Sequence, residues 1–434
     1  MDLTLEVRNI EYFMKPIHII SRLLGLSLHS PIIEPGLNEK VLTTHLFSVI
    51  WASAVFIVNL SALLFRITIT LIEPPYSQSS VISCVFAMPL SHIAAMVSII
   101  LSAVFKRKEI TELFFKLALV DKCLRISENK YIYKKHRNIL FLSVIVTIIG
   151  LSTFYCFDIY VWSLPSPSTT AYEIVIHICY LTNVVTLMQF LNWVESLHYR
   201  LWIFCSYIPK SKTNMLDYIN DTFIISKTKS EVLSLHKRTR RLTTNPVSDL
   251  IFLSVRKEYN LKRKKMNYRN EFSRQIFQLR IIYEYIYDST NSILSIYGFI
   301  MLLDITCNVL YFISNTFSVL NILIQSGEEK PLKFIAVYCG WSFISLTKII
   351  LTVVSCHKIS KKRESCVDRV QKLLLLRDLT EDAFTQLQLF ADQLEYKKMQ
   401  FNACGFFQLD LSLLNDIMTA ATTYIIVLIQ NREY

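Results

Sequence analysis

The sequence lacks the short motifs by which enzymes are usually recognised. Its 7 glycines are too scattered for a G-x-G-x-x-G or P-loop segment, its 9 histidines are dispersed, and no nucleophile motif occurs. The 10 cysteines include no C-x-x-C pair, so we expect neither disulfides nor a zinc site. We therefore predict a protein that is not an enzyme, with no catalytic residues, no metal and no cofactor.

Charged residues are scarce as well. They make up 18% of the 434 residues, whereas hydrophobic residues make up 52%. About 20 apolar residues are needed to cross roughly 30 Å of hydrocarbon, and apolar runs of this length are too long and continuous for barrel strands. We predict an all-α membrane protein with seven transmembrane helices, at Val41–Arg66, Ser80–Phe105, Asn138–Ser163, Tyr172–Tyr199, Ile286–Ile313, Leu332–Cys356 and Leu409–Gln430.

Positive charge is nearly absent from every second gap between these spans. Lysines and arginines number 4 before the first span, 10 between the second and third, 18 between the fourth and fifth, and 9 between the sixth and seventh. Cationic loops stay in the cytoplasm, which predicts a cytoplasmic N-terminus and an extracellular C-terminus. This orientation is the reverse of a G-protein-coupled receptor. The net charge of +12 then faces anionic lipid headgroups, and we expect membrane lipid but no nucleic acid as a partner.

The chain divides into four parts on this basis. Residues 1–40 form a cytoplasmic N-terminus whose prolines, such as Pro16, break any long helix, and residues 41–356 hold six spans with their basic loops. We interpret the loop 200–285 as topogenic charge with a disordered middle. Residues 357–408 form anchor-like cytoplasmic helices, in which Phe384 and Phe390 favour packing on equivalent helices of other subunits over lying on lipid. Residues 409–434 contain the seventh span and a short outer tail.

The seventh span is polar along one side. At 100° per residue, five polar residues fall within about 60°, with Val427 interrupting the stripe near its outer end, and apolar residues cover the opposite face. The stripe has two interpretations: a packing seam between helices, or one wall of an aqueous pore that needs several copies of the helix. Val427 and Gln430 then form a narrow ring that gates by dewetting. The candidate pore-lining residues are Ser412, Asp416, Thr419, Thr423, Val427 and Gln430.

Polar and aromatic residues also occur in the outer halves of the middle spans. Aromatic residues at span ends commonly serve as interface anchors, but ionisable groups at this depth are costly unless they are paired or wet. If these spans converge on a cavity, its mostly aromatic wall suits a small amphipathic molecule better than a sugar alone. The candidate ligand-binding residues are His92, Asp158, Trp162, His177, Tyr180, Asn308, Tyr311 and Trp341. Asp304 and Lys348, near mid-membrane on adjacent spans, are predicted to form a structural ion pair.

The end of the chain resembles a known family. The segment Phe401–Asp410, which includes Ala403-Cys404-Gly405-Phe406-Phe407, precedes Thr423-Tyr424, five apolar residues and Gln430. This pattern is similar to the C-terminal signature of insect gustatory receptors, whose motif residues carry over as Thr423, Tyr424 and Gln430. The signature usually ends in Phe, where this chain has Asn431.

The resemblance implies a ligand-gated, nonselective cation channel in the plasma membrane of chemosensory neurons. Such channels are tetramers of identical or related subunits, with the last helix at the central pore and a ligand pocket among the second to sixth helices. Within the family, a receptor for bitter plant compounds is our first hypothesis, and a receptor for fructose or another sugar is the second. A metabotropic seven-helix receptor requires the opposite orientation, and a transporter requires internal repeats or broken helices that the sequence does not show.

Overall fold

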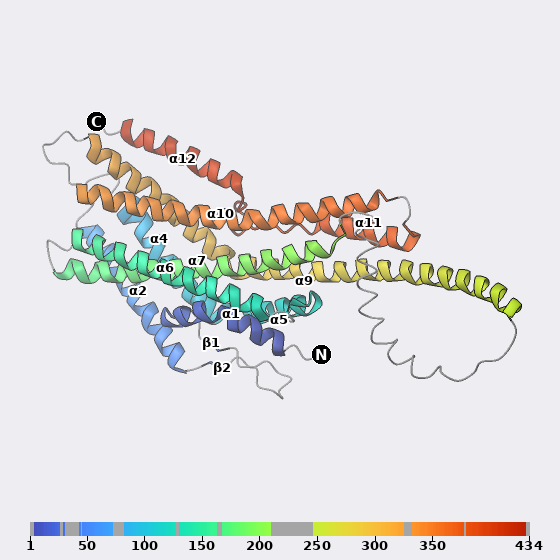
Figure 1. Cartoon of the computed structure of the whole chain (residues 1–434). Helices are drawn as coiled ribbons and strands as arrows, with labels where there is room; N and C mark the ends of the chain where they lie inside the picture. The colour runs from blue at the N-terminus through green and yellow to red at the C-terminus, as the bar shows by residue number, and fades with distance from the viewer. Residues whose placement is uncertain are drawn as a thin grey trace. The chain divides into compact units, whose positions relative to one another are not determined.

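A computed structural model describes residues 4–26, 29–30, 43–44, 46–72, 82–126, 130–162, 167–209, 246–324, 332–376 and 379–430. Within these ranges the chain is almost entirely helical (Figure 1), as the sequence predicts. The exception is a two-stranded antiparallel sheet in which β1 (His29–Ser30) pairs with β2 (Thr43–Thr44).

Six helices of the described chain are long and apolar enough to cross a membrane. They are α2 (Leu46–Ile72), α6 (Lys130–Trp162), α7 (Pro167–Tyr207), α9 (Pro246–Ile324), α10 (Leu332–Leu374) and α12 (Leu411–Gln430). The remaining predicted span forms three consecutive helical segments: η1 (Ile82–Ala87), α4 (Met88–Ile100) and η2 (Leu101–Phe105). Its apolar helix, Val85–Ile100, is shorter than the six others. Each predicted span therefore corresponds to helix, and six of them meet the length of a membrane crossing.

The chain forms two compact units. The first comprises Met1–Tyr199, Asp288–Ile359 and Gln400–Tyr434, and the second comprises Arg200–Tyr287 and Ser360–Met399. Three of the long helices, α7, α9 and α10, therefore contribute residues to both units.

In the first unit, α1 (Thr4–Leu23) packs on α5 (Arg107–Cys123) and α6. The sequence prediction that Pro16 prevents a long helix here is wrong, since α1 is 20 residues long and contains this proline. Residues Val7, Ile10, Phe13, Met14 and Ile17 recur at helical spacing and are buried. Burial of this apolar face offsets the roughly 3 kcal/mol that an interior proline costs a helix.

In the second unit, α11 (Glu381–Tyr396) begins at Thr380, whose hydroxyl accepts a hydrogen bond from the Ala383 amide at 3.2 Å. The two phenylalanines predicted to pack behave differently: Phe390 is buried, and Phe384 is exposed. Phe390 meets the rings of Phe204 and Tyr283, each at a centroid distance of 6.2 Å. Phe390 is thus used within the chain, and packing of these helices on other subunits stays a prediction.

The interpretation of residues 200–285 as a loop with a disordered middle is wrong from Pro246 onward, where α9 begins and continues into the fifth span (Figure 1). Proline is favoured in the first turn of a helix, and the lysines and arginines that follow are good helix formers. Residues 210–245, including the basic run Lys237–Arg241, lie outside the described residues.

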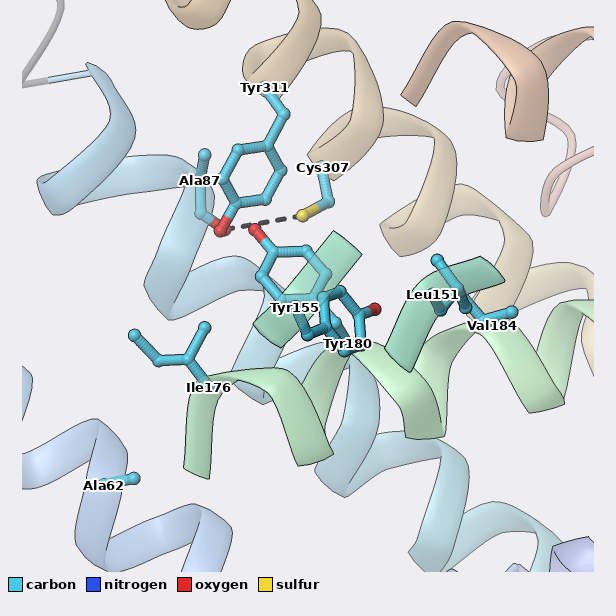
Figure 2. Close-up of a cluster of buried hydrophobic side chains, with 9 residues drawn as sticks. All are labelled: Ala62, Ala87, Leu151, Tyr155, Ile176, Tyr180, Val184, Cys307 and Tyr311. Carbon is cyan, nitrogen blue, oxygen red and sulfur yellow. Dashed lines mark hydrogen bonds between the residues drawn. The ribbon is translucent and has the colours of Figure 1, made fainter. Parts of the chain in front are cut away.

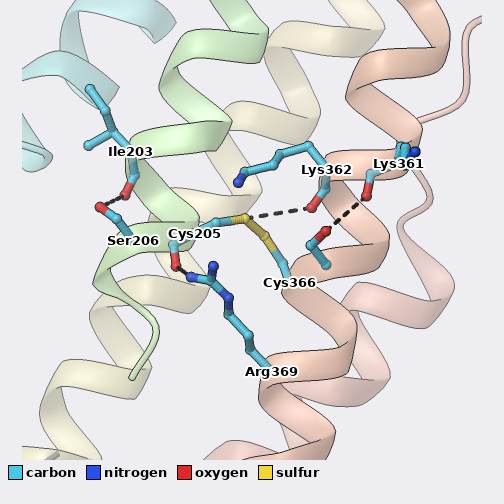
Figure 3. Close-up of a disulfide and its surroundings, with 8 residues drawn as sticks. Ile203, Cys205, Ser206, Lys361, Lys362, Cys366 and Arg369 are labelled. Atoms are coloured by element: carbon cyan, nitrogen blue, oxygen red, sulfur yellow. Dashed lines mark hydrogen bonds between the residues drawn. A yellow bond between two sulfur atoms is a disulfide. The ribbon is translucent and has the colours of Figure 1, made fainter. Parts of the chain in front are cut away.

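The prediction that the chain forms no disulfide is also wrong. Cys205 near the end of α7 and Cys366 on α10 are joined, with 5.6 Å between their Cα atoms (Figure 3). The two cysteines are 161 residues apart, and spacing in the sequence gives no sign of a contact that long helices create.

Candidate functional site

One candidate site is the outward face of α12. The helix packs on α9 through Ala421 and Leu428, which join Ile313 and Phe317 in one apolar cluster. Leu413 and Ile417 are buried on the same side. The apolar face of α12 is therefore used within the chain, and the sequence analysis had not assigned Leu413 and Ile417 to it.

The predicted polar stripe of α12 lies away from this contact. All six candidate pore-lining residues, from Ser412 to Gln430, are exposed, as is the neighbouring Asn415. The hydroxyls of Thr419 and Thr423 donate to backbone carbonyls one turn earlier, at 2.9 and 3.0 Å. These bonds satisfy the hydroxyl protons locally and leave the oxygen atoms available to water or another chain.

The start of α12 is fixed by a carboxylate. Oδ1 of Asp410 accepts hydrogen bonds from the Ser412 hydroxyl at 2.6 Å and from the Ser412 amide at 3.0 Å. One member of the polar stripe, Ser412, thus serves as a local partner of the helix cap.

The segment before α12 is a tight turn. The Ala403 amide donates to the Phe407 carbonyl at 3.0 Å, and the Leu409 amide donates to the Phe401 carbonyl at 2.8 Å. Gly405, at φ +81°, adopts a left-handed conformation that a side chain would strain. The Ala-Cys-Gly-Phe-Phe block of the sequence is therefore a turn that ends directly at the cap of α12.

The second candidate site is a cluster of aromatic rings among α6, α7, α9 and α10. The His177 ring stacks on Tyr155 at 4.4 Å between centroids and on Trp341 at 6.0 Å. The ring centroid of Tyr180 lies 4.5 Å from that of Trp341 and 5.2 Å from that of Tyr311. Figure 2 shows the three tyrosines of this cluster gathered with Cys307, whose thiol donates to the Ala87 carbonyl at 3.4 Å.

Polar atoms sit inside this aromatic cluster. The indole nitrogen of Trp341 donates to Oδ2 of Asp158 at 3.1 Å, and the same oxygen lies 3.5 Å from Nε2 of His177. Both Asp158 and His177 are buried, and Asp158 Oδ1 and His177 Nδ1 have no hydrogen-bond partner among the described residues. Buried polar atoms without partners are costly, and they mark places where a ligand or water can bind.

Six of the eight predicted ligand-binding residues therefore come together: Asp158, Trp162, His177, Tyr180, Tyr311 and Trp341. Trp162 forms a side-chain hydrogen bond with Asp158, and its ring centroid also lies 5.1 Å from that of Phe334 and 6.2 Å from that of Tyr338. Asn308 is buried on α9 and donates to the Asp304 carbonyl one turn earlier. His92 is buried on α4 beside Ser91, whose backbone and hydroxyl oxygens each accept from Asn183 at 3.0 Å.

Two residues that organise the cluster were not among the predicted ligand contacts. Tyr155 lies one helical turn before Asp158, a spacing that indicates the same face of α6. Gly340 lets α10 approach α6, because a Cβ atom there would lie 2.3 Å from the ring of Phe154. The spacing of Tyr155 was visible in the sequence, whereas the close approach at Gly340 depends on the packing of two helices distant along the chain.

Comparisons with known proteins agree with the resemblance at the C-terminus. Residues 230–432 match the sequence model of a family described as 7tm chemosensory receptor. Over 106 residues the chain is 30% identical to putative gustatory receptor 28b of Drosophila melanogaster, a match that spans 24% of this chain and 22% of that protein. Both matches are to insect chemosensory receptors, and the family model matches the C-terminal part of this chain.

Solved structures show the same fold. The receptor is similar to the olfactory receptor OR5 from Machilis hrabei, with a TM-score of 0.58, 11% identity, and coverage of 98% of this chain and 99% of that chain. The structure of OR5 in complex with eugenol gives a TM-score of 0.57 at 12% identity, covering 97% of this chain and 99% of that one. These matches agree with the resemblance predicted from the C-terminal signature, and the matched family is one of multi-pass membrane receptors.

The family match includes both the turn of residues 401–409 and helix α12. Of the signature residues in the receptor, Thr423, Tyr424 and Gln430 are all exposed on α12. Asn431, where the family signature usually has Phe, lies outside the described residues.

Proposed function

We propose that the receptor is a gustatory receptor of the plasma membrane: a ligand-gated, nonselective cation channel opened by small tastants. The observation that carries the proposal is the geometry of α12. This helix uses its apolar face within the chain and leaves its polar face exposed, although its mean hydropathy and length suit a membrane span. In a bilayer, polar side chains need protein or water as a neighbour.

A single polar stripe cannot enclose a pore, so the proposal requires several copies of the receptor around an axis. A tetramer of identical or related subunits meets this requirement and agrees with the family resemblance. Seven membrane crossings, with the N-terminus in the cytoplasm and the C-terminus outside, follow from the alternation of basic loops. Asp416 would then lie toward the cytoplasmic end of the pore, where one carboxylate per subunit attracts cations and repels anions.

The ligand class is proposed from the aromatic cluster. Stacked rings with one carboxylate, one imidazole and one indole N–H favour a flat, largely apolar molecule that carries a hydroxyl or amine. Bitter plant compounds have this character, and the related OR5 has been solved in complex with eugenol. A sugar presents many hydroxyls and little apolar surface, which makes it the second candidate.

The test is to express the receptor alone and to apply a panel of aromatic plant compounds and sugars during whole-cell recording. We expect inward cation current that persists when G-protein signalling is blocked with a nonhydrolysable GDP analogue in the pipette. Loss of the response under the block would contradict a channel and favour a metabotropic receptor.

The site is tested by Trp341→Phe, which keeps a ring but removes the N–H that binds Asp158. We expect a rise in the half-maximal concentration of the compound, because Asp158 loses the hydrogen bond that holds its carboxylate in place. Trp202→Phe is the matched control, because Trp202 is 53% exposed near the end of α7. Equal effects of the two changes would place the ligand elsewhere.

A further inference from the structure

The cysteine pair of the second unit is separate from both candidate sites. Cys205 and Cys366 are both fully buried, and they bring together α7 and α10 at positions 161 residues apart. Figure 3 shows the bridge between the two helices, with Arg369 and Lys362 beside it. These residues all belong to the second compact unit.

The surroundings of the pair suit both the oxidised and the reduced form. In this bridged structure, Sγ of Cys205 lies 3.7 Å from the Lys362 carbonyl, which is close enough to accept a hydrogen bond from Cys205 once it is a thiol. The guanidinium of Arg369 donates to the backbone carbonyl of Cys205, which places a permanent cation beside one of the two cysteine residues. A neighbouring cation favours the thiolate, which is the form that reacts with oxidants.

The predicted topology places this pair on the cytoplasmic side, where glutathione keeps most thiols reduced. Disulfides in the cytosol are therefore mainly transient, and many of them are redox sensors. We propose that Cys205 and Cys366 are a site of reversible oxidative modification, at which a peroxide converts two thiols to a disulfide that staples α7 to α10. The compartment in this inference rests on the topology proposed above, whereas the chemistry does not require the receptor to conduct ions.

The reaction balances with a peroxide as the oxidant. One thiolate attacks the peroxide, so that an S–O bond forms, the O–O bond breaks, and the released hydroxide takes up a proton to leave as water. The second thiolate then attacks the sulfenic sulfur, so that the S–S bond forms and the S–O bond breaks, releasing a second water. Two thiols lose two electrons, the peroxide gains them, and a cellular thiol reverses the step by exchange.

The location of the pair gives the modification a consequence for the receptor. The same two helices carry His177 and Tyr180 on α7 and Trp341 on α10, which belong to the aromatic cluster. A covalent link between α7 and α10 restrains relative sliding of these helices, whereas the dithiol leaves them held by side-chain packing. Oxidation is therefore expected to act as a brake on any rearrangement in which α10 moves against α7.

The experiment measures the link directly. Cells expressing the full receptor are treated with hydrogen peroxide, or with peroxide followed by dithiothreitol, free thiols are blocked with N-ethylmaleimide during lysis, and the purified receptor is digested without reduction. We expect the linked peptides containing Cys205 and Cys366 to increase at least fivefold with peroxide and to return to the untreated amount after dithiothreitol. The oxidised receptor should also unfold at a higher temperature than the reduced one.

Three variants test whether the linked peptides come from a disulfide between Cys205 and Cys366. Cys205→Ser and Cys366→Ser should each abolish the linked peptides and the difference in unfolding temperature. Cys356→Ser, at a buried cysteine ten residues earlier on α10, should change neither. Absence of the linked peptides from peroxide-treated wild-type receptor would overturn the proposal. A link present in equal amount under every treatment would overturn it as well, because it would be a permanent structural bridge.

Discussion

Lys348 on α10 lies with its Nζ 2.6 Å from Oδ1 of Asp304 on α9, and both side chains are at most 10% exposed. The sequence predicts this pair from two opposite charges at similar depth on adjacent spans, and the structure confirms the contact. Neither charge faces lipid alone, which is the arrangement that an apolar environment requires.

Removal of one partner should therefore be much worse than removal of both. Asp304→Asn leaves a buried ammonium group and should cost about 3–5 kcal/mol of stability, which we expect to appear as loss of receptor from the cell surface. Combining it with Lys348→Met should restore part of the surface expression, because no uncompensated charge then remains. Surface biotinylation measures both variants.

The less buried pair of Lys106 and Glu109 provides the control for this experiment. Nζ of Lys106 lies 2.8 Å from Oε1 of Glu109, and the two side chains are 23% and 35% exposed, respectively. An exposed pair contributes about 0–1 kcal/mol, so Glu109→Gln should leave surface expression close to wild type. Equal loss from Glu109→Gln and Asp304→Asn would show that burial does not set the cost.

Gly340 should be intolerant of even one added methyl group. A Cβ atom at this position meets the Phe154 ring at 2.3 Å, so Gly340→Ala must displace the ring or separate α10 from α6. Overpacking of this kind costs about 1–3 kcal/mol and should also weaken the response to any ligand held by Trp341. Gly150→Ala on α6 is the matched control, since no atom lies within 4 Å of its Cβ position. Thermal unfolding of the purified receptor in detergent measures both changes.

The sequence contains the information for the spans, the ion pair and much of the aromatic cluster. Hydropathy depends on composition alone, and ionisable residues such as Asp158 and His177 are conspicuous inside apolar runs. The clearance at Gly340 and the cysteine pair depend on which helices pack together, and one sequence does not give that information. Pro16 illustrates a second limit, because its local cost to α1 is outweighed by packing that only the tertiary structure shows.

The docking of α1 should depend on pH through Glu11. Burial raises the pKa of this carboxyl to about 7 from an ordinary 4.5, and the nearby Arg8 lowers it by a smaller amount. Between these two values the folded protein holds a proton that the unfolded chain has released, so the free energy of unfolding falls as the pH rises from about 4.5 to 7. The side chain in Glu11→Gln cannot release a proton. The free energy of unfolding of this variant should therefore fall less steeply between pH 4.5 and 7 than that of the wild type. Identical slopes for the variant and the wild type, measured by thermal unfolding in detergent, would contradict the prediction.

The two faces of α12 should differ in their reaction with water-soluble thiol reagents. In the single chain, Leu413 and Ile417 are buried against the protein, whereas Thr419 and Thr423 are exposed on the polar stripe. If the stripe lines a pore, Thr419→Cys and Thr423→Cys should react with a charged methanethiosulfonate when agonist is present, and the current should fall as they react. Leu413→Cys and Ile417→Cys should stay silent. Met418 lies on neither of these two faces and is 43% exposed, so it is a poorer silent control.

Charge and gating can be tested on the same helix. Asp416→Asn removes one carboxylate per subunit and should lower single-channel cation conductance with little change in the half-maximal agonist concentration.

Asn431 replaces the phenylalanine usual in the family, so Asn431→Phe should reduce basal current if this position belongs to the gate. Equal thiol labelling of both faces, or no labelling of the polar face, would make the stripe a packing seam between helices. The channel assignment would then depend on the family resemblance alone.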